Sequence, residues 1–152
     1  IERTKCVWGL LCSMSSVDQE RNNISLFNVI EQFNIPKDFF AQQKKEKKLL
    51  LFPLPYEVIL LFRRTLLEFD QEEISADFKI KTLDPSGTTL QETIVPFKLS
   101  KGIKKLRLRH VLPGIFASMP GSYIHQIEIK ELTQNSFRKV LEIPFEIEMK
   151  KS

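Results

Sequence analysis

The stretch "ISADFKIKTLDPSGTTLQETIVPFKL", from Ile74 to Leu99, holds two segments that flank a tight turn. In the first segment, Phe78 and Ile80 alternate with Lys79 and Lys81, which is the period of a β-strand with one buried face. The "DPSG" between the segments has Pro at its second position and Gly at its fourth, as a β-turn prefers. The stretch therefore predicts two strands joined by a turn.

Alternation of this kind recurs along most of the chain, in "IKKLRLRHV", "SYIHQIEIKEL" and "KVLEIPFEIEMK". In contrast, "ISLFNVIEQF" and "YEVILLFRRTLLEF" are apolar on both faces, which indicates central or covered strands. Pro96 and Pro144 fall inside strand-like runs, and we expect those strands to lie at sheet edges or to hold bulges, because proline donates no N–H. The expected strands cover residues 4–12, 24–34, 56–66, 73–83, 88–99, 103–111, 122–132 and 138–149.

Many short strands with regular turns in one chain of 152 residues predict a single all-β domain over residues 1–152. We expect an immunoglobulin-like or C2-like antiparallel β-sandwich of about seven or eight strands. The segment "KDFFAQQKKEKKLL", residues 37–50, is the exception, and it predicts a loop with a helical turn, or at most one short helix. Twelve Phe against one Trp and two Tyr predict that most Phe rings fill the core, and some exposed rings could mark a contact surface.

The composition argues against a membrane protein and against a disulfide framework. No apolar run reaches the roughly 18 residues of a membrane helix, no secretory signal pattern opens the chain, and we expect a cytoplasmic location. The chain begins at Ile1 rather than Met, and a trimmed N-terminus stays open as an alternative. Cys6 and Cys12 lie roughly 20 Å apart along one expected strand, too far for a disulfide, so we expect two free thiols.

The residues that carry most enzyme chemistry form no recognisable pattern. His110 and His125 are the two histidines, and both fall on the apolar sides of their expected strands, where a histidine is usually a core residue. The chain has no Gly-x-Ser-x-Gly elbow, no zinc spacing and no EF-hand pattern, and its five glycines form no phosphate loop. We therefore expect no catalytic residue, no metal site and no cofactor.

Basic charge is the clearest functional signal. The net charge of +4 permits an anionic partner without requiring one. Cations gather in "KKEKK", residues 44–48, and along one face of the strand at 103–111, where they could hold phosphates or carboxylates. The alternative is a solvated outer face whose lysines prevent edge pairing. The candidate anion-binding residues are Lys44, Lys45, Lys47, Lys48, Lys105, Arg107 and Arg109.

Several segments carry a resemblance in the same order along the chain. They are the apolar "LLC" at 10–12, "ISLF" at 24–27, "KIKTLDPSGTTL", "PGSY" and "VLEIPFEIE". Together they resemble the DUF6941 proteins, which are prokaryotic β-sandwich domains of unassigned function. The resemblance implies the same fold and carries over no catalytic residue. The chain departs from the family pattern at Asn28, where Gly is common, and in its Lys-rich segment at 44–48.

We expect a non-catalytic interaction module that binds a protein partner or a second copy of itself. The alternative is a binder of an anionic ligand or nucleic acid through the basic strand face and the Lys-rich segment, and such binding would weaken as salt rises. A polar loop at 13–23, between the first two expected strands, is a further surface to test, because loops at sandwich ends often bind.

Overall fold

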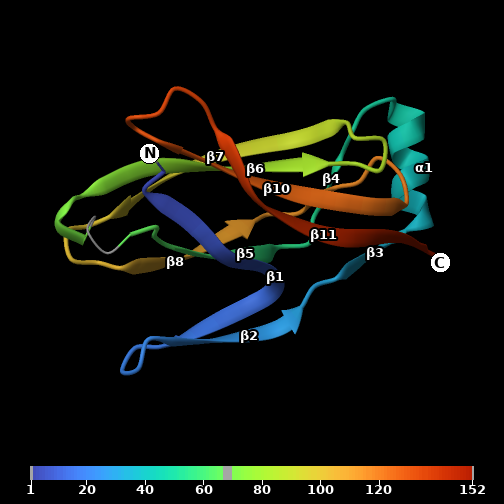
Figure 1. The fold of residues 1–152 in the computed structure, drawn as a ribbon. Coiled ribbons are helices and arrows are strands. Elements are labelled where there is room, and N and C mark those ends of the chain that lie inside the picture. The colour runs from blue at the N-terminus through green and yellow to red at the C-terminus, as the bar shows by residue number, and fades with distance from the viewer. Residues whose placement is uncertain (1, 67–69, 152) are drawn as a thin grey trace.

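The computed structural model describes residues 2–66 and 70–151, and the chain is mostly β (Figure 1). A four-stranded sheet has the order β2-β1-β5-β8, with β1 Thr4–Asp18, β2 Asn23–Val29, β5 Tyr56–Arg64 and β8 Lys105–Leu112. A five-stranded sheet has the order β3-β11-β10-β6-β7, with β3 Gln32–Pro36, β6 Ile74–Leu83, β7 Thr89–Leu99, β10 Gly121–Glu131 and β11 Arg138–Lys150. The pair β4 Leu51–Phe52 and β9 Ile115–Phe116 and the helix α1 Lys37–Glu46 complete the fold. Within these residues no helix is long and apolar enough to cross a membrane.

The chain is mostly β, as predicted, and the differences from the expected elements are local. The loop with a helical turn expected at 37–50 is instead a ten-residue helix, within the limit of one short helix. Asp38 in its first turn and Lys44 and Lys45 in its last turn complement the helix dipole. The run expected to be apolar on both faces at 56–69 forms β5 up to Arg64, and residues 67–69 lie outside the described part.

The single strand expected at 24–34 is wrong, because the chain crosses from one sheet to the other there. Asn28 has a left-handed backbone with φ 53°, which Asn tolerates better than most residues. The next residues bond to both sheets: the Ile30 N–H donates to the Leu11 carbonyl at 2.8 Å, and the Glu31 carbonyl accepts from the Glu146 N–H at 2.9 Å. The chain then continues as β3, parallel to β11.

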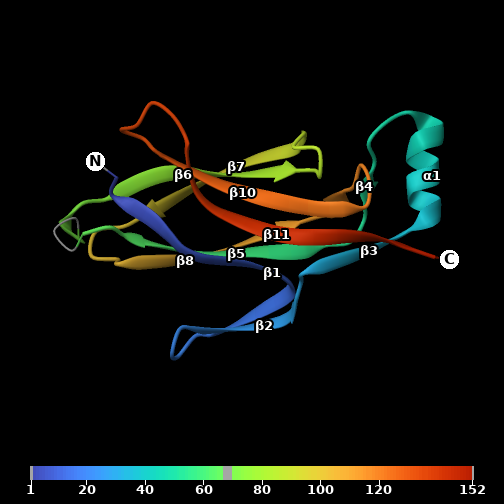
Figure 2. The ribbon, with the colours of Figure 1, turned by 45° about the vertical axis from the view of Figure 1, so that its right-hand side comes forward.

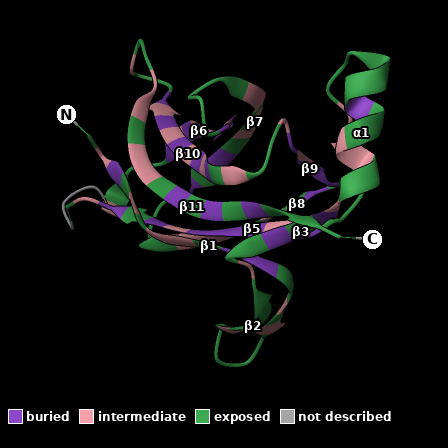
Figure 3. Cartoon of the chain, turned by 90° about the vertical axis from the view of Figure 1, so that its right-hand side faces the viewer, coloured by how far each residue is buried: buried purple, intermediate pink, exposed green. Residues whose placement is uncertain are grey.

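The core lies between the two sheets (Figures 2 and 3). The predicted alternation is confirmed in β6 and β10, where every second side chain is buried. The Phe33 ring packs edge-on against Tyr56 and Phe145, with centroids 5.1 and 5.4 Å away. Phenylalanine also fills the core as predicted: among the described Phe side chains, five are buried, and Phe27 is the one that is exposed.

Both internal prolines occupy positions that suit a residue without an N–H. Pro96 lies in β7, which is an edge strand. Pro144 lies in β11, whose pairing with β3 begins only at Glu146, so β11 is locally an edge at the proline. The prediction of edge positions is confirmed for both.

Beyond Cys12, β1 runs past the end of β5 and pairs only with β2. We call this hairpin, residues 13–29, the β1–β2 arm; none of its residues belongs to the core cluster, and Figure 3 shows it projecting below the two sheets. The loop expected at 13–23 is therefore strand as far as Asp18, with a turn only at 19–22. The expectation of a central or covered strand is wrong for β2, because β2 is an edge strand with Phe27 and Val29 47% and 48% exposed.

The predicted core position of His125 is confirmed, and its ring is held by two hydroxyl groups. Its Nε2 is 2.8 Å from the Tyr56 hydroxyl and its Nδ1 is 2.9 Å from Thr82 Oγ1, with all three residues buried. A neutral imidazole has one N–H donor and one acceptor nitrogen, so both contacts are satisfied by the uncharged ring. Burial lowers the pKa of His125 to about 3.

We expect the free energy of unfolding to fall as the pH drops from 6.5 toward 3. In this window the unfolded chain protonates His125 and the folded chain does not, which costs about 1.4 kcal/mol per pH unit. The variant His125→Gln keeps one donor and one acceptor but does not titrate, so its pH dependence should be flatter. Urea unfolding at pH 7, 6, 5 and 4 measures this.

The control for that series is His110→Gln, because His110 is only half-buried against the Phe78 ring. It should flatten the profile less than His125→Gln does. Parallel profiles for the wild type and His125→Gln would contradict the assignment of acid sensitivity to the buried ring.

Candidate functional site

The seven candidate cations do not form one surface. Lys44, Lys47 and Lys48 line a groove beside α1, whereas Lys45 on the same helix is exposed and is not among the lining residues. Lys105, Arg107 and Arg109 lie on β8, away from α1 (Figure 1). The cations of the two sequence segments are therefore separated by the fold.

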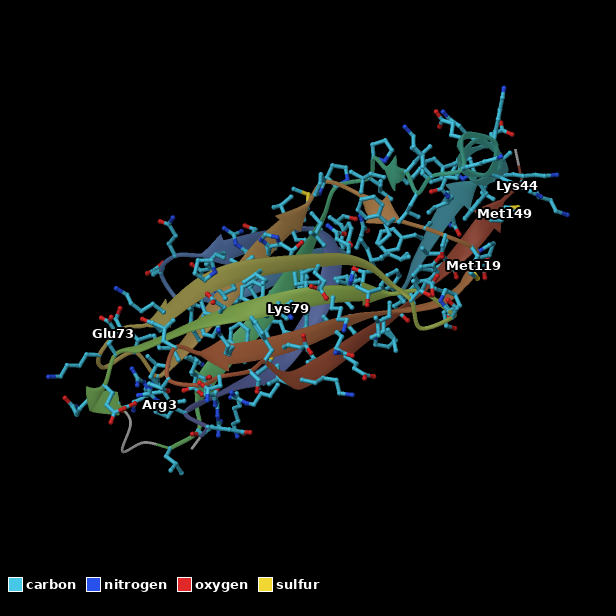
Figure 4. All side chains as sticks on the ribbon, turned by 90° about the horizontal axis from the view of Figure 1, so that it is seen from above. Arg3, Lys44, Glu73, Lys79, Met119 and Met149 are labelled. Carbon is cyan, nitrogen blue, oxygen red and sulfur yellow. The ribbon has the colours of Figure 1, made fainter. Side chains whose placement is uncertain are left out.

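The α1 groove is a hollow of about 550 Å³ between the C-terminal half of α1 and the segment Ser118–Pro120. Besides the three lysines, its lining is mainly apolar. Met119 and Met149 are 40% and 42% exposed, and Figure 4 shows both near Lys44 at one end of the molecule. The apolar lining residues are Phe40, Leu49, Met119, Pro120 and Met149.

The lysines converge because α1 ends abruptly. Lys47 has a left-handed backbone with φ 54°, and the Lys48 N–H donates to the Gln43 carbonyl at 3.4 Å. This C-terminal cap reverses the chain, so Lys47 and Lys48 lie on the same side as Lys44. A lysine in the left-handed backbone conformation is roughly 1 kcal/mol less stable than a glycine would be. Lys47 therefore lowers the stability of the folded chain slightly while it adds a positive charge to the groove.

Gln43 fixes the helix against the opposite wall of the groove. Its side chain is buried, its Nε2 donates to the Ala117 carbonyl at 2.6 Å, and its Oε1 accepts from the Leu50 N–H at 2.8 Å. The wall itself depends on Gly114, because a Cβ there would lie 2.1 Å from the Phe52 carbonyl oxygen. The Gln43 side chain thus fixes the distance of α1 from the backbone at Leu50 and at Ala117.

Ser118 in the groove wall is bonded to a buried carboxylate. Its hydroxyl donates to Asp84 Oδ2 at 2.8 Å, while Asp84 Oδ1 accepts from Ser86 and Thr88. Burial disfavours the charged form, but these hydrogen bonds outweigh it and lower the pKa of Asp84. The Asp84 carboxylate is already hydrogen-bonded by Ser86 and Thr88 of the turn. Because no histidine lines the groove either, Ser118 has no neighbouring general base that would make it a nucleophile. Across residues 2–66 and 70–151 no cluster of metal-ligating side chains occurs.

The cations on β8 hold the β1–β2 arm. Arg107 donates to the Asn22 carbonyl at 3.1 Å and to Asn22 Oδ1 at 2.9 Å. Arg109 donates to Ser15 Oγ at 3.3 Å, and Ser15 in turn donates to both carboxylate oxygens of Glu57 at 2.8 and 2.7 Å. Lys105 is exposed beside them. Two members of the predicted cationic ladder therefore bind the protein's own backbone and side chains.

Sequence reasoning missed the apolar half of the groove. Alternation placed Met149 on the inner face of the last strand, but at this position β11 has passed the end of β10 and pairs only with Ile35 of β3, which leaves Met149 42% exposed. Met119 lies in the segment "PGIFASMPG", whose Pro-Gly pairs indicate a loop but not its apolar contacts. The buried role of Gln43 had no local signal.

No family model matches the chain, and no curated protein matches it. Among solved structures, the Pseudomonas fluorescens alkylpurine DNA glycosylase AlkC bound to DNA containing an abasic site analog has a TM-score of 0.47 and 9% identity, covering 95% of this chain and 30% of that chain. The PmoD soluble domain from Methylocystis sp. ATCC 49242 (Rockwell) has a TM-score of 0.33 and 10% identity, covering 95% of this chain and 97% of that one. This chain therefore spans less than a third of the glycosylase, and likenesses at these scores assign no function.

We expect Gln43→Ala to destabilise the chain by roughly 1–3 kcal/mol, because it leaves the Ala117 carbonyl and the Leu50 N–H without their partner. The matched control is Gln42→Ala on the exposed side of the same helix, which should change stability by less than about 0.5 kcal/mol. Urea unfolding of both variants measures the difference, and equal midpoints would contradict the structural role of Gln43.

We expect Arg107→Ala to loosen the β1–β2 arm, because the guanidinium bonds two acceptors on Asn22. Amide hydrogen exchange in residues 23–29 should speed up by roughly tenfold, as expected from the loss of about 1.4 kcal/mol of charge-assisted hydrogen bonding. Lys105→Ala removes a cation from the same strand face and should leave this exchange unchanged. An equal effect of both variants would show that net charge, not the Asn22 contact, restrains the arm.

Proposed function

We propose that this chain is a non-catalytic interaction module whose α1 groove binds a protein segment that carries both carboxylates and large apolar side chains. The observation that supports this most is the composition of the lining, in which three lysines lie beside exposed methionine and leucine side chains and the half-buried Phe40. An exposed apolar surface rimmed by charge is typical of a protein contact.

The lysines and the apolar side chains of the groove would contribute different amounts of binding free energy. An exposed ion pair contributes about 0.2–1 kcal/mol, so three lysines alone would hold a partner weakly. Burying one large apolar side chain contributes about 1.5–3 kcal/mol. We infer that apolar anchors on the partner supply most of the affinity and that the lysines select acidic partners and speed their approach. Met119 and Met149 adapt readily to anchors of different shape, because their side chains are unbranched and polarisable.

The groove suits a peptide better than an enclosed small molecule, because its methionines remain two-fifths exposed in the free chain. An anionic ligand or nucleic acid on the β8 face has less support, since Arg107 and Arg109 are engaged by the arm. A continuous phosphate backbone would also need cations along one path, and the two cationic groups lie apart.

Three finer assignments accompany this proposal. The sandwich is of the immunoglobulin or C2 type, supported by two mainly antiparallel sheets around one core. Membership of the DUF6941 family is supported by the residues that resemble it. A cytoplasmic location is supported by the two free thiols, Cys6 and Cys12, because unpaired cysteines are typical of a reducing compartment.

The test is a display selection of random twelve-residue peptides on the wild-type chain, with counter-selection on the double variant Lys44→Glu/Lys48→Glu. We expect enriched peptides to combine Asp or Glu with Leu, Phe or Met, and to bind the double variant at least tenfold more weakly in fluorescence anisotropy. The matched control is Lys45→Glu, which alters the same helix outside the lining and should change the affinity by less than twofold. Affinity should also fall as salt rises from 50 to 300 mM.

Two results would contradict the proposal. One is enrichment of peptides without acidic residues. The other is an equal loss of affinity in Lys45→Glu and in the double variant, which would indicate non-specific charge attraction. Retention on heparin and oligonucleotide columns tests the alternative function. Retention that depends on Lys105 rather than Lys44 would favour an anion-binding role of β8.

A further inference from the structure

We propose that the free edge of β2 pairs with β2 of a second copy of this chain, antiparallel and across a two-fold axis, so that two four-stranded sheets become one. This surface is separate from the α1 groove, and the proposal does not depend on what the groove binds.

Apart from the left-handed backbone at Asn28, near its C-terminal end, β2 lacks the features that protect the other sheet edges against pairing. The edge strand β8 carries Lys105, Arg107 and Arg109, β7 carries Pro96 and Lys98, and β3 is short and ends at Pro36. Charge, proline and brevity are the usual means by which an edge avoids strand addition. The β2 sequence "NISLFNV" has neither a charge nor a proline, and its outer side faces no other described strand.

Exposed apolar side chains accompany this edge. Phe27 lies opposite Met14 across the arm, and Val29 lies opposite Cys12. Met14, Phe27 and Val29 are 57%, 47% and 48% exposed. The arm therefore presents apolar side chains to solvent at the end where it joins the four-stranded sheet. An added strand would cover part of this surface as well as the backbone groups.

The arm also lacks the support that a sheet normally gives to a strand pair. Past Cys12 it has only two strands, since β5 has ended, and a two-stranded ribbon is marginally stable in water. Contacts of Arg107 and Arg109 hold one side of the arm to β8. Pairing through β2 would supply a third and fourth strand on the other side.

A second copy fits this edge better than a charged partner strand. Antiparallel pairing of β2 with itself brings only uncharged residues face to face, so it avoids the like-charge repulsion that pairing of β8 with itself would produce. Each chain has a net charge of +4, but the arm's own charged residues, Asp18, Glu20 and Arg21, sum to −1. The nearby cations Arg107 and Arg109 of β8 are engaged by Asn22 and Ser15 of the same chain. The symmetric contact is closed, so it yields a dimer rather than a fibre.

The test measures molar mass by light scattering over 1–300 μM for the wild type, Phe27→Lys and Ile94→Lys. Phe27→Lys places a charge on each side of the two-fold contact. Ile94→Lys is the matched control, because Ile94 is an exposed apolar residue, 54% exposed, on the edge strand β7. We expect a concentration-dependent dimer for the wild type and Ile94→Lys, with at least tenfold weaker association for Phe27→Lys.

Ser25→Lys is a second variant for the case that Phe27→Lys fails to fold, as judged by circular dichroism; Ser25 is exposed on the same strand and should give the same loss. Amide exchange in residues 23–29 should slow as the wild-type concentration rises. A wild type that stays monomeric at 300 μM would overturn the proposal. So would a dimer that survives both β2 variants, or one that Ile94→Lys disrupts equally.

Discussion

The crossing of the chain between sheets at residues 28–31 is the constraint on which the rest of the structure depends. Asn28 turns the backbone out of the four-stranded sheet, and Ile30 and Glu31 bond to one sheet each. The crossing places β3 parallel to β11 at the edge of the five-stranded sheet, and α1 begins as soon as β3 ends. It also leaves the preceding hairpin without a place between the sheets.

Both proposed contact surfaces follow from that crossing. The α1 groove exists because the helix follows β3 directly, beside the part of β11 that has passed the end of β10 and presents Met149 to water. The β1–β2 arm exists because β1 is longer than β5 and continues alone with β2. In each case an element that extends past its neighbours exposes apolar side chains that a core would otherwise cover.

How far the sequence predicts this structure depends on whether a feature is local. Alternation predicted β6 and β10 residue by residue, because a half-buried strand repeats its environment every second position. The same reasoning failed at 24–34, since apolar residues on both faces look alike in a central strand and in an exposed arm. It also failed to distinguish Arg107 bound to Asn22 from a solvated arginine, because the partner lies far away in the sequence.

In the candidate site, too, the sequence predicted local features and missed contacts between distant segments. The lysines of the groove were visible in "KKEKK", but Met119 and Met149 come from a loop and a strand more than 70 residues further along the chain. No local pattern reports that Gln43 will meet the Ala117 carbonyl, because that contact depends on the packing of the whole domain. A cationic segment was thus predicted, and the groove it rims was not.

The position of the β1–β2 arm outside the core cluster has a consequence for how this domain can change over time. Insertions and substitutions in residues 13–29 would disturb few buried contacts, and each doubling of a loop's length costs only about 0.6 kcal/mol. Relatives of this chain can therefore lengthen, shorten or recharge the arm while the two sheets keep their packing. We expect the arm to be the most variable part of the fold in length, and the inner faces of β6 and β10 to be the least.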